Sequence, residues 1–391
     1  MRQTEWLQET RMRRFEEAYW KWRARKLTQD EAAELLGVCE RTFRRYTERY
    51  EEDGPEGLYD KRMRQTSHKK APGFEVQDVI EKYRERHQGW NVKHYYSHYR
   101  RGGGKRSYTW VKTALQAAGE VARAKGKGKH RKKRDKSPLI GMMIHQDGST
   151  HEWVKGQKHD LIATMDDATN EIYSLFLVEE EGTQSSMRGV RETVEAKGIF
   201  CTFYSDRASH YWHTPEAGGK VDKKNPTQFG AAMERLGVEM IPAYSPEARG
   251  RSERAFATHQ ERLPKELALA EIADIESANR YIKEIYLARF NEEFKKPARE
   301  EGSAFVPLYD ADLDEIFCEK YERKVGNDNC VVFEGKRLQI PADRHRFNYV
   351  RAKVKVHRYG DSTLAIFHGP RCLARYDVCG KPLEEAKKKA A

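Results

Sequence analysis

The sequence has no long apolar run. No segment of its 391 residues approaches the roughly 18 consecutive apolar residues that a membrane-spanning helix needs. The first twenty residues, MRQTEWLQETRMRRFEEAYW, are charged throughout and lack the apolar centre of a signal peptide. These absences predict a cytoplasmic protein with no membrane partner.

Paired cysteines are also missing. The six cysteines include no CxxC pair, and no histidine stands near them at the spacing of a zinc site. We therefore expect reduced thiols and no zinc. The cysteines are Cys39, Cys201, Cys318, Cys330, Cys372 and Cys379.

Positive charge, in contrast, is in excess. The formal net charge is +12, and residues 123–136 (RAKGKGKHRKKRDK) hold nine Lys/Arg and one Asp. A local basic run of this kind favours phosphate contacts, although a solvated tether has the same composition. We predict a linker over 121–138 whose DNA-binding candidates are Lys129, Arg131, Lys132, Lys133 and Arg134.

Residues 1–62 are predicted to be helical, with a helix-turn-helix at their centre. Thr28 and Glu31 have the spacing of a capping box, and Gly37 supplies a tight turn. A second helix begins near Cys39, and its outward residues include Arg41, Arg44 and Arg45. Such a helix enters the DNA major groove in this motif, whereas the alternative is an ordinary helical hairpin with a solvated basic face.

Residues 74–120 predict a second helical unit of three helices, in which Ser107 caps the third and Gly119 ends it. The unit resembles another helix-turn-helix. However, its aromatic residues are equally compatible with three-helix packing that makes no DNA contact.

The rest of the chain predicts two further domains, so the expected class is multidomain α + α/β + β. Residues 139–300 contain three meandering strands followed by alternating helices and strands, which indicate a mixed five-stranded sheet. Residues 330–380 contain short alternating strands with turn residues between them, which indicate a small β-barrel.

Three acidic residues stand in positions suited to catalysis. Asp147 (HQDGSTHEW) and Asp206 (FYSDRASHYW) each close a predicted strand, and Glu253 (SPEARGRSERAF) opens a long helix. Two strand-end aspartates and one helix glutamate suit a site for Mg²⁺, which prefers oxygen ligands. Two such ions can clamp both reacting oxygens of a phosphodiester.

These segments, together with IATMDDATNEI and ARFNEEF, resemble bacterial insertion-sequence transposases of the retroviral-integrase, RNase H-like superfamily, nearest the ISNCY-type group. The resemblance implies an RNase H-like core over 139–300 with a DDE triad of Asp147, Asp206 and Glu253 that binds two Mg²⁺, for which Mn²⁺ can substitute. It also implies that Arg249, Arg251 and Arg254 lie near the DNA.

One interval departs from the family. Asp206 and Glu253 are 47 positions apart, more than in many relatives, and the additional polar segment is residues 210–227. This segment either contacts DNA or a second subunit, or is a surface excursion.

Other polar residues near the triad have competing interpretations. Asp166 and Asp167 are expected to form a turn, and His145 to be a structural hydrogen-bonding residue. The long helix after Glu253 carries Arg254, His259, Arg262 and Lys265 among apolar residues. Part of that face is expected to pack on the sheet, and the outward part either contacts DNA ends or is solvated.

The function that follows is a transposase that binds the terminal inverted repeats of its element and performs Mg²⁺-dependent cleavage and strand transfer. Its partners are double-stranded DNA, both element ends and target, and further copies of the chain in a dimer or larger assembly. The expected location is the bacterial cytoplasm, at the nucleoid. The alternatives are an RNase H-like nuclease without strand transfer and an inactive, DNA-binding repressor.

Overall fold

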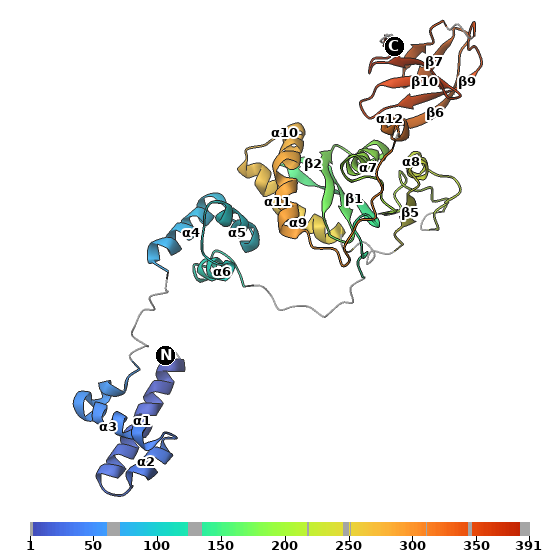
Figure 1. Cartoon of the computed structure of the whole chain (residues 1–391). Coiled ribbons are helices and arrows are strands. Elements are labelled where there is room, and N and C mark those ends of the chain that lie inside the picture. Colours follow the sequence, from blue (N-terminus) through green and yellow to red (C-terminus); the bar gives the residue numbers. More distant parts are fainter. Residues whose placement is uncertain are drawn as a thin grey trace, which may run out of the picture. The chain divides into compact units, whose positions relative to one another are not determined.

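The computed structural model describes residues 3–60, 71–123, 135–216, 219–244, 250, 252–309, 311–342 and 346–383 (Figure 1). The chain forms two compact units, Met1–Lys82 and Tyr83–Ala391. The second unit contains more than one of the domains that the sequence predicts.

The first unit is helical. Its core is aromatic, with Phe15, Tyr19 and Phe43 buried against one another. Its elements are α1 (Gln3–Arg23), α2 (Gln29–Leu35), α3 (Glu40–Asp53), a 3₁₀ turn (Gly54–Leu58) and most of α4 (Gly73–Arg86), which continues into the second unit.

The helix-turn-helix signals of the sequence are present in this unit. The Thr28 side chain accepts from the Glu31 amide, and the Thr28 amide donates to Glu31 at 2.7 Å, so the predicted capping box is confirmed. Gly37 has φ +67°, the left-handed conformation that the turn requires. Three arginines of α3 point outward, as predicted, and are exposed: Arg41, Arg44 and Arg45.

Two short helices follow α4 in the second unit, α5 (Val92–Arg101) and α6 (Tyr108–Ala117). Ser107 caps α6 by accepting from the Trp110 amide, as predicted. Tyr83 and Tyr95 are buried edge to face, so at least these aromatic residues are core.

The central sheet has five strands in the order β3-β2-β1-β4-β5, and it is mixed, as predicted. The β1–β2 and β2–β3 pairs are antiparallel, whereas β1–β4 and β4–β5 are parallel. The strands are β1 (Met143–Val154), β2 (Gln157–Asp166), β3 (Ile172–Val178), β4 (Thr202–Ser205) and β5 (Glu239–Pro242).

Helices cover both faces of this sheet (Figure 1). On one face α7 (Thr183–Lys197) and α8 (Gln228–Leu236) bury Ile144 and Phe203. On the other face, Trp153 and Leu161 pack against α9 (Ser252–Leu269) and the helices after it. These later helices are α10 (Ile275–Tyr281), a π-helical turn (Ile282–Tyr286) and α11 (Leu287–Phe294).

The C-terminal strands form a five-stranded antiparallel sheet, β12-β11-β10-β9-β6, and a separate β7-β8 hairpin that shares its apolar core. Among the described residues no pairing joins β12 to β6, so a closed barrel remains a prediction. The elements, which follow α12 (Leu313–Ile316), are β6 (Glu319–Lys324), β7 (Cys330–Phe333), β8 (Lys336–Gln339), β9 (Lys353–Arg358), β10 (Leu364–His368), β11 (Arg371–Tyr376) and β12 (Pro382–Leu383).

The six cysteines are all free in the structure. In the part of the chain that the structure describes, no helix combines the length and apolar character needed to cross a bilayer.

Candidate active site

Asp147 and Asp206 belong to neighbouring parallel strands. The register of β1 and β4 pairs His145 with Tyr204, and two further residues along each chain are Asp147 and Asp206. Asp147 is buried within β1, and Asp206 directly follows the last residue of β4. β1 continues beyond Asp147 to Val154, so the prediction that Asp147 closes a strand is wrong, whereas Asp206 does stand at the end of β4. The parallel register places the two residues beside each other on neighbouring inner strands of the sheet.

Backbone amides orient both carboxylates. The Gly148 amide donates to Oδ1 of Asp147 at 3.1 Å, and the Ala208 amide donates to Oδ1 of Asp206 at 3.0 Å. The orientation of both side chains is therefore fixed by the local backbone.

Tyr211 is a buried side chain whose pKa is affected by several acidic residues. Its side chain is buried and its hydroxyl donates to Gln146 at 2.9 Å. Burial raises the pKa of Tyr211 well above its ordinary value, and the negative charges of Glu181, Asp206 and Asp147 raise it further. The negative charges of three carboxylates thus act on one buried hydroxyl.

Glu253 lies in the first turn of α9 and is exposed. Two turns further along the same helical face, Gln260 donates to the Ser149 hydroxyl of β1 at 3.0 Å. This bond attaches α9 to β1 two residues beyond Asp147. Among the described residues, the triad is not one of the groups whose ligand atoms all lie within 4.8 Å of one another.

Several DNA-binding candidates of the sequence lie outside the described residues. They are Lys129, Arg131, Lys132, Lys133 and Arg134 of the basic run, and Arg249 and Arg251 of the segment before α9. Arg254 is described and is exposed in the first turn of α9.

The acidic residues that compete with the triad have structural roles. Asp166 accepts from the Gly141 amide and from the amide and hydroxyl of Thr169, which forms the turn after β2. Asp167 accepts from His145 at 2.7 Å. Both interpretations from the sequence, a turn-forming Asp-Asp pair and a structural His145, agree with these contacts.

Comparison with known proteins gives three kinds of similarity. A family model described as a winged helix-turn-helix matches residues 18–75. The transposase y4bF of Sinorhizobium fredii is 29% identical over 233 residues, 58% of this chain and 50% of the relative. The transposase for insertion sequence IS1202 of Streptococcus pneumoniae is 26% identical over 222 residues, 57% of this chain and 47% of the relative.

The chain is similar to insertion-sequence transposases. The resemblance predicted from its sequence motifs is confirmed at this level, and the chain spans about half the length of the curated relatives that it matches.

Solved structures give a more distant likeness. A chain of the simian T-cell lymphotropic virus intasome in complex with PP2A regulatory subunit B56 gamma is 11% identical with a TM-score of 0.34, and the match covers 68% of this chain and 88% of that chain. The HTLV-2 integrase catalytic core domain in complex with magnesium is 12% identical with a TM-score of 0.28, over 38% and 89% respectively.

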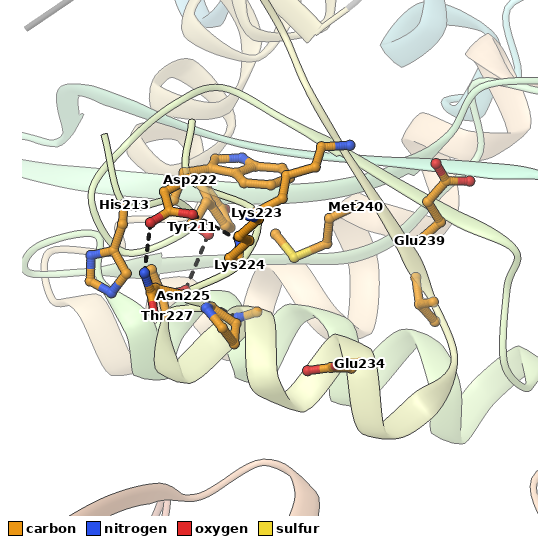
Figure 2. Close-up of a pocket in the computed structure, with 14 residues that line it drawn as sticks. Tyr211, His213, Asp222, Lys223, Lys224, Asn225, Thr227, Glu234, Glu239 and Met240 are labelled. Atoms are coloured by element: carbon orange, nitrogen blue, oxygen red, sulfur yellow. Dashed lines mark hydrogen bonds between the residues drawn. The ribbon is translucent and has the colours of Figure 1, made fainter. Parts of the chain in front are cut away.

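The additional polar segment between Asp206 and Glu253, residues 210–227, is anchored at both ends. Near its start Tyr211 and Trp212 are buried, and at its end Thr227 donates to the Tyr211 carbonyl at 3.1 Å. Between them a bridge joins His213 to Asp222. Figure 2 shows the pocket of about 270 Å³ that the segment forms with α8 and β5. The base of the segment is therefore part of the core.

Two polar residues of α9, His259 and Arg262, belong to the part of its face that is packed inside the fold. His259 is fully buried beside the Tyr286 hydroxyl, at 3.0 Å, and burial lowers its pKa to about 3. Arg262 is also buried and makes a bidentate ion pair with Glu293, at 2.8 and 3.0 Å. Neither side chain is available to DNA. Lys265 is bonded to the Gly89 carbonyl at 2.9 Å.

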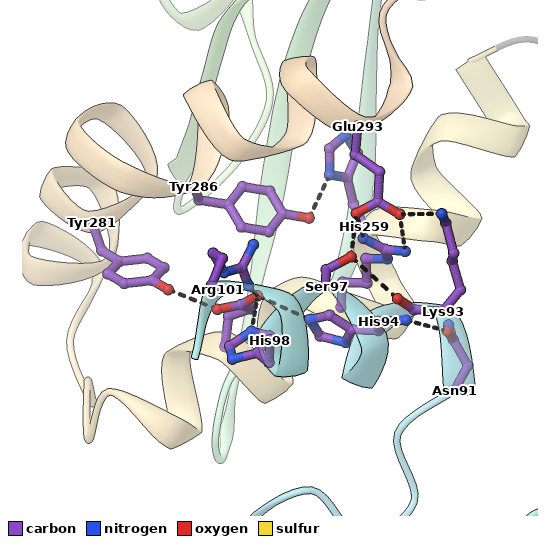
Figure 3. A network of polar contacts seen from close by, with 12 residues as sticks. Asn91, Lys93, His94, Ser97, His98, Arg101, His259, Tyr281, Tyr286 and Glu293 are labelled. Atoms are coloured by element: carbon purple, nitrogen blue, oxygen red, sulfur yellow. Dashed lines mark hydrogen bonds and ion pairs between the residues drawn. The ribbon is translucent and has the colours of Figure 1, made fainter. Parts of the chain in front are cut away.

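A polar network joins α5 and α9 (Figure 3), and no pattern in the sequence predicted it. His94 and His98, one turn apart on α5, lie 2.9 and 2.7 Å from Oε1 of Glu266 on α9. Tyr281 donates to the other oxygen at 2.8 Å, and the Arg101 guanidinium is 3.7 Å from Oε1. The ligand atoms suit a metal by spacing alone. The nearby guanidinium and the hydrogen bonds that both Glu266 oxygens accept instead favour a structural ion cluster.

Sequence reasoning missed Glu181, which contributes to the negative potential around Tyr211. The signal available was its position at the end of a predicted strand, in EEEGTQSS, where three consecutive glutamates hide which one points inward.

Proposed function

We propose that this chain is a DDE transposase, which binds the terminal inverted repeats of an insertion sequence and cuts and joins DNA with the help of divalent cations. The observation that carries the proposal is that Asp147 on β1 lies beside Asp206, which follows the last residue of the adjacent parallel strand β4. The similarity to named transposases supports the same reaction class.

The side chains of the three acidic residues have the chemistry that a pair of Mg²⁺ ions requires. Carboxylate oxygens are the ligands that Mg²⁺ prefers, and the negative potential that raises the pKa of Tyr211 is what divalent cations neutralise. We assign Asp147, Asp206 and Glu253 as the residues that would hold them, with Mn²⁺ as a substitute. When bound, such ions lower the pKa of water and stabilise the negative charge that develops on the phosphoryl oxygens.

Each part of the chain has a separate task in this proposal. The aspartates are held by backbone amides, so they need little reorganisation during the reaction. Glu253 completes the set from α9, which Gln260 attaches to β1. In this proposal Asp147 and Asp206 supply rigid acidic groups, and other residues hold the DNA.

DNA recognition is assigned to the basic residues. The exposed arginines of α3 are proposed to read base edges in the major groove: Arg41, Arg44 and Arg45. The basic run 123–136 is proposed to contact phosphates without sequence preference. Arg249, Arg251 and Arg254 are proposed to hold the DNA beside the cleaved bond. Because two DNA ends must be joined, the active assembly is proposed to contain two or more copies.

The deciding experiment is a strand-transfer assay on an element end with a pre-cut 3′-OH. Joining to target DNA by the wild-type chain, and its loss in Asp206→Asn with end binding retained, supports the proposal. Cleavage without joining would instead identify a nuclease. DNA binding that shows neither activity, at any Mg²⁺ or Mn²⁺ concentration, would identify a repressor.

Recognition has its own test. Alanine at Arg41 or Arg45 is expected to weaken binding to the element end by about 1–3 kcal/mol if a bidentate guanine contact is lost. Replacing Lys and Arg in 123–136 is expected to weaken binding to every sequence and to flatten its salt dependence. An unchanged salt slope would remove that run from the interface.

A further inference from the structure

Glu181 lies against the backbone of the residue that follows Asp147. A Cβ built on Gly148 would come within 2.1 Å of Oε2 of Glu181 and within 2.6 Å of its Cδ. The carboxylate therefore occupies the space that any side chain at position 148 would need. Since the Gly148 amide also donates to Oδ1 of Asp147, two carboxylates lie against the same glycine.

The backbone of Glu181 is fixed in this place. Its amide donates to Oδ2 of Asp160 at 2.7 Å, and Oδ1 of the same carboxylate accepts from the Thr150 hydroxyl at 2.5 Å. The next residue, Gly182, begins α7 and donates to the Ser185 hydroxyl at 2.9 Å. A chain of bonds from β1 through β2 thus sets where the Glu181 side chain begins.

The surroundings of the Glu181 carboxylate are acidic. The only ion pair given for it among the described residues is with His210, whose Nε2 lies 3.5 Å from Oε1, longer than a hydrogen bond. Of the charges that act on the Tyr211 hydroxyl, that of Glu181 is the largest, ahead of Asp206 and Asp147. A cation bound beside Glu181 and Asp147 would offset the repulsion between like charges.

We propose that Glu181 is a fourth carboxylate of the active site and a ligand for one of the divalent cations. This assignment rests on the proposed function, since it adds a residue to the same metal site. It also gives Gly148 a role, because only a residue without Cβ leaves room for the fourth ligand.

The competing role for Glu181 is a structural one, as a partner of His210 or as part of the turn before α7. A structural residue would change folding without changing the affinity for metal. The two roles are therefore separated by measuring metal binding in the absence of DNA, beside cleavage.

The experiment titrates the full-length chain with Mn²⁺ by calorimetry, without DNA, and measures cleavage of an element end in parallel. The variants are Glu181→Gln, Glu181→Asp and His210→Gln, and the matched control is Glu180→Gln, which removes the same charge from an exposed neighbour. Glu181→Gln is expected to weaken Mn²⁺ binding and cleavage by about 10- to 100-fold. Glu181→Asp is expected to recover part of both, and Glu180→Gln and His210→Gln to bind Mn²⁺ as the wild type does.

Gly148→Ala tests the geometry without removing any acidic group. The added methyl must displace the Glu181 carboxylate, so Mn²⁺ affinity is expected to fall as in Glu181→Gln. Combined with Glu181→Ala, which empties the space, Gly148→Ala is expected to cost nothing more. Fully additive losses would contradict a shared site.

The two proposals fail in different ways. If Glu181→Gln binds Mn²⁺ and cuts DNA as the Glu180→Gln control does, the fourth ligand is wrong, and loss of cleavage in Asp147→Asn still supports the transposase. Equal losses in Glu181→Gln and His210→Gln with unchanged Mn²⁺ binding would assign Glu181 to His210. If Asp147→Asn also keeps its activity, the proposed function itself is wrong.

Discussion

Two regions of the second unit contain buried or partly buried carboxylates, and the groups that surround these carboxylates differ. Between α5 and α9, the single carboxylate of Glu266 is surrounded by donors from His94, His98 and Tyr281. Beside β1 and β4, the charges of Glu181, Asp206 and Asp147 all act on one buried hydroxyl, that of Tyr211. The carboxylate of the first region is held by donors of the protein, whereas the acidic residues of the second are proposed to be held by cations.

The pKa shifts express this difference. Burial opposes the ionisation of Glu266, but the hydrogen bonds from His94 and His98 outweigh it and hold the pKa of Glu266 far below its ordinary value. Beside β1 and β4, burial raises the pKa of Tyr211, and the acidic groups raise it further. A carboxylate enclosed by donors is thus a structural feature, and carboxylates that crowd one another mark a candidate metal site.

The largest expected effect is the loss of DNA cleavage when an aspartate of the candidate metal site is replaced. Asp147→Asn and Asp206→Asn are expected to lower DNA cleavage by at least about 10³-fold, since loss of metal binding removes several kcal/mol of transition-state stabilisation. Both variants should fold and still bind the element end. Single-turnover cleavage and a gel-shift assay check this, and loss of end binding in both would contradict the separation of tasks.

The next effect concerns stability. Glu266→Ala is expected to destabilise the second unit by about 3–5 kcal/mol, because it leaves buried histidines and the Arg101 guanidinium without their acceptor. Urea denaturation followed by circular dichroism measures the change. Asp147→Asn serves as the control, since it should change the free energy of unfolding far less. Comparable losses in both variants would erase the contrast between the regions.

Acid should weaken the α5–α9 network. Burial lowers the pKa of His94, so the folded state favours the neutral ring, and stability falls as the pH drops below the ordinary value of 6.5. The lowered pKa of Glu266 adds a second loss below 4.5. Melting temperatures between pH 7.5 and 4 check this expectation. His94→Gln, which cannot titrate, should flatten the upper part of that profile, and an unchanged slope would assign the acid sensitivity elsewhere.

The smallest effect concerns the contact that ties α9 to the sheet. Gln260→Ala removes the bond to Ser149 and is expected to cost about 1 kcal/mol of stability. If that bond positions Glu253, cleavage should fall while end binding is unchanged. Glu261→Ala, at the exposed neighbouring position, is the control. Equal cleavage by both variants would show that α9 is positioned without this contact.

Local features were predictable from the sequence, because they depend on residues close together in the chain. The capping box of Thr28 and Glu31, the left-handed Gly37 and the Ser107 cap all involve residues within a few positions of one another. The order of strands and helices in the core followed from apolar periodicity in the same way.

Burial of polar residues on α9 was not predictable. His259 and Arg262 have the composition of a solvated or DNA-binding face, yet both are enclosed by the helices that follow. Their partners, Tyr286 and Glu293, are 27 and 31 positions away. Periodicity distinguishes apolar from polar faces, and it cannot detect a polar face that other polar groups cover.

By itself, the sequence determined the order of the core elements, the position of Asp206 at the end of a strand, the glutamate at the start of α9 and the resemblance to transposases. Only the tertiary structure decided that Glu181 lies against Gly148, and that Glu266 accepts from histidines 168 and 172 positions away. The physical reason is the range of the interactions. Caps, turns and periodicity act between neighbours in the chain, whereas the approach of two carboxylates depends on how the sheet and its helices pack.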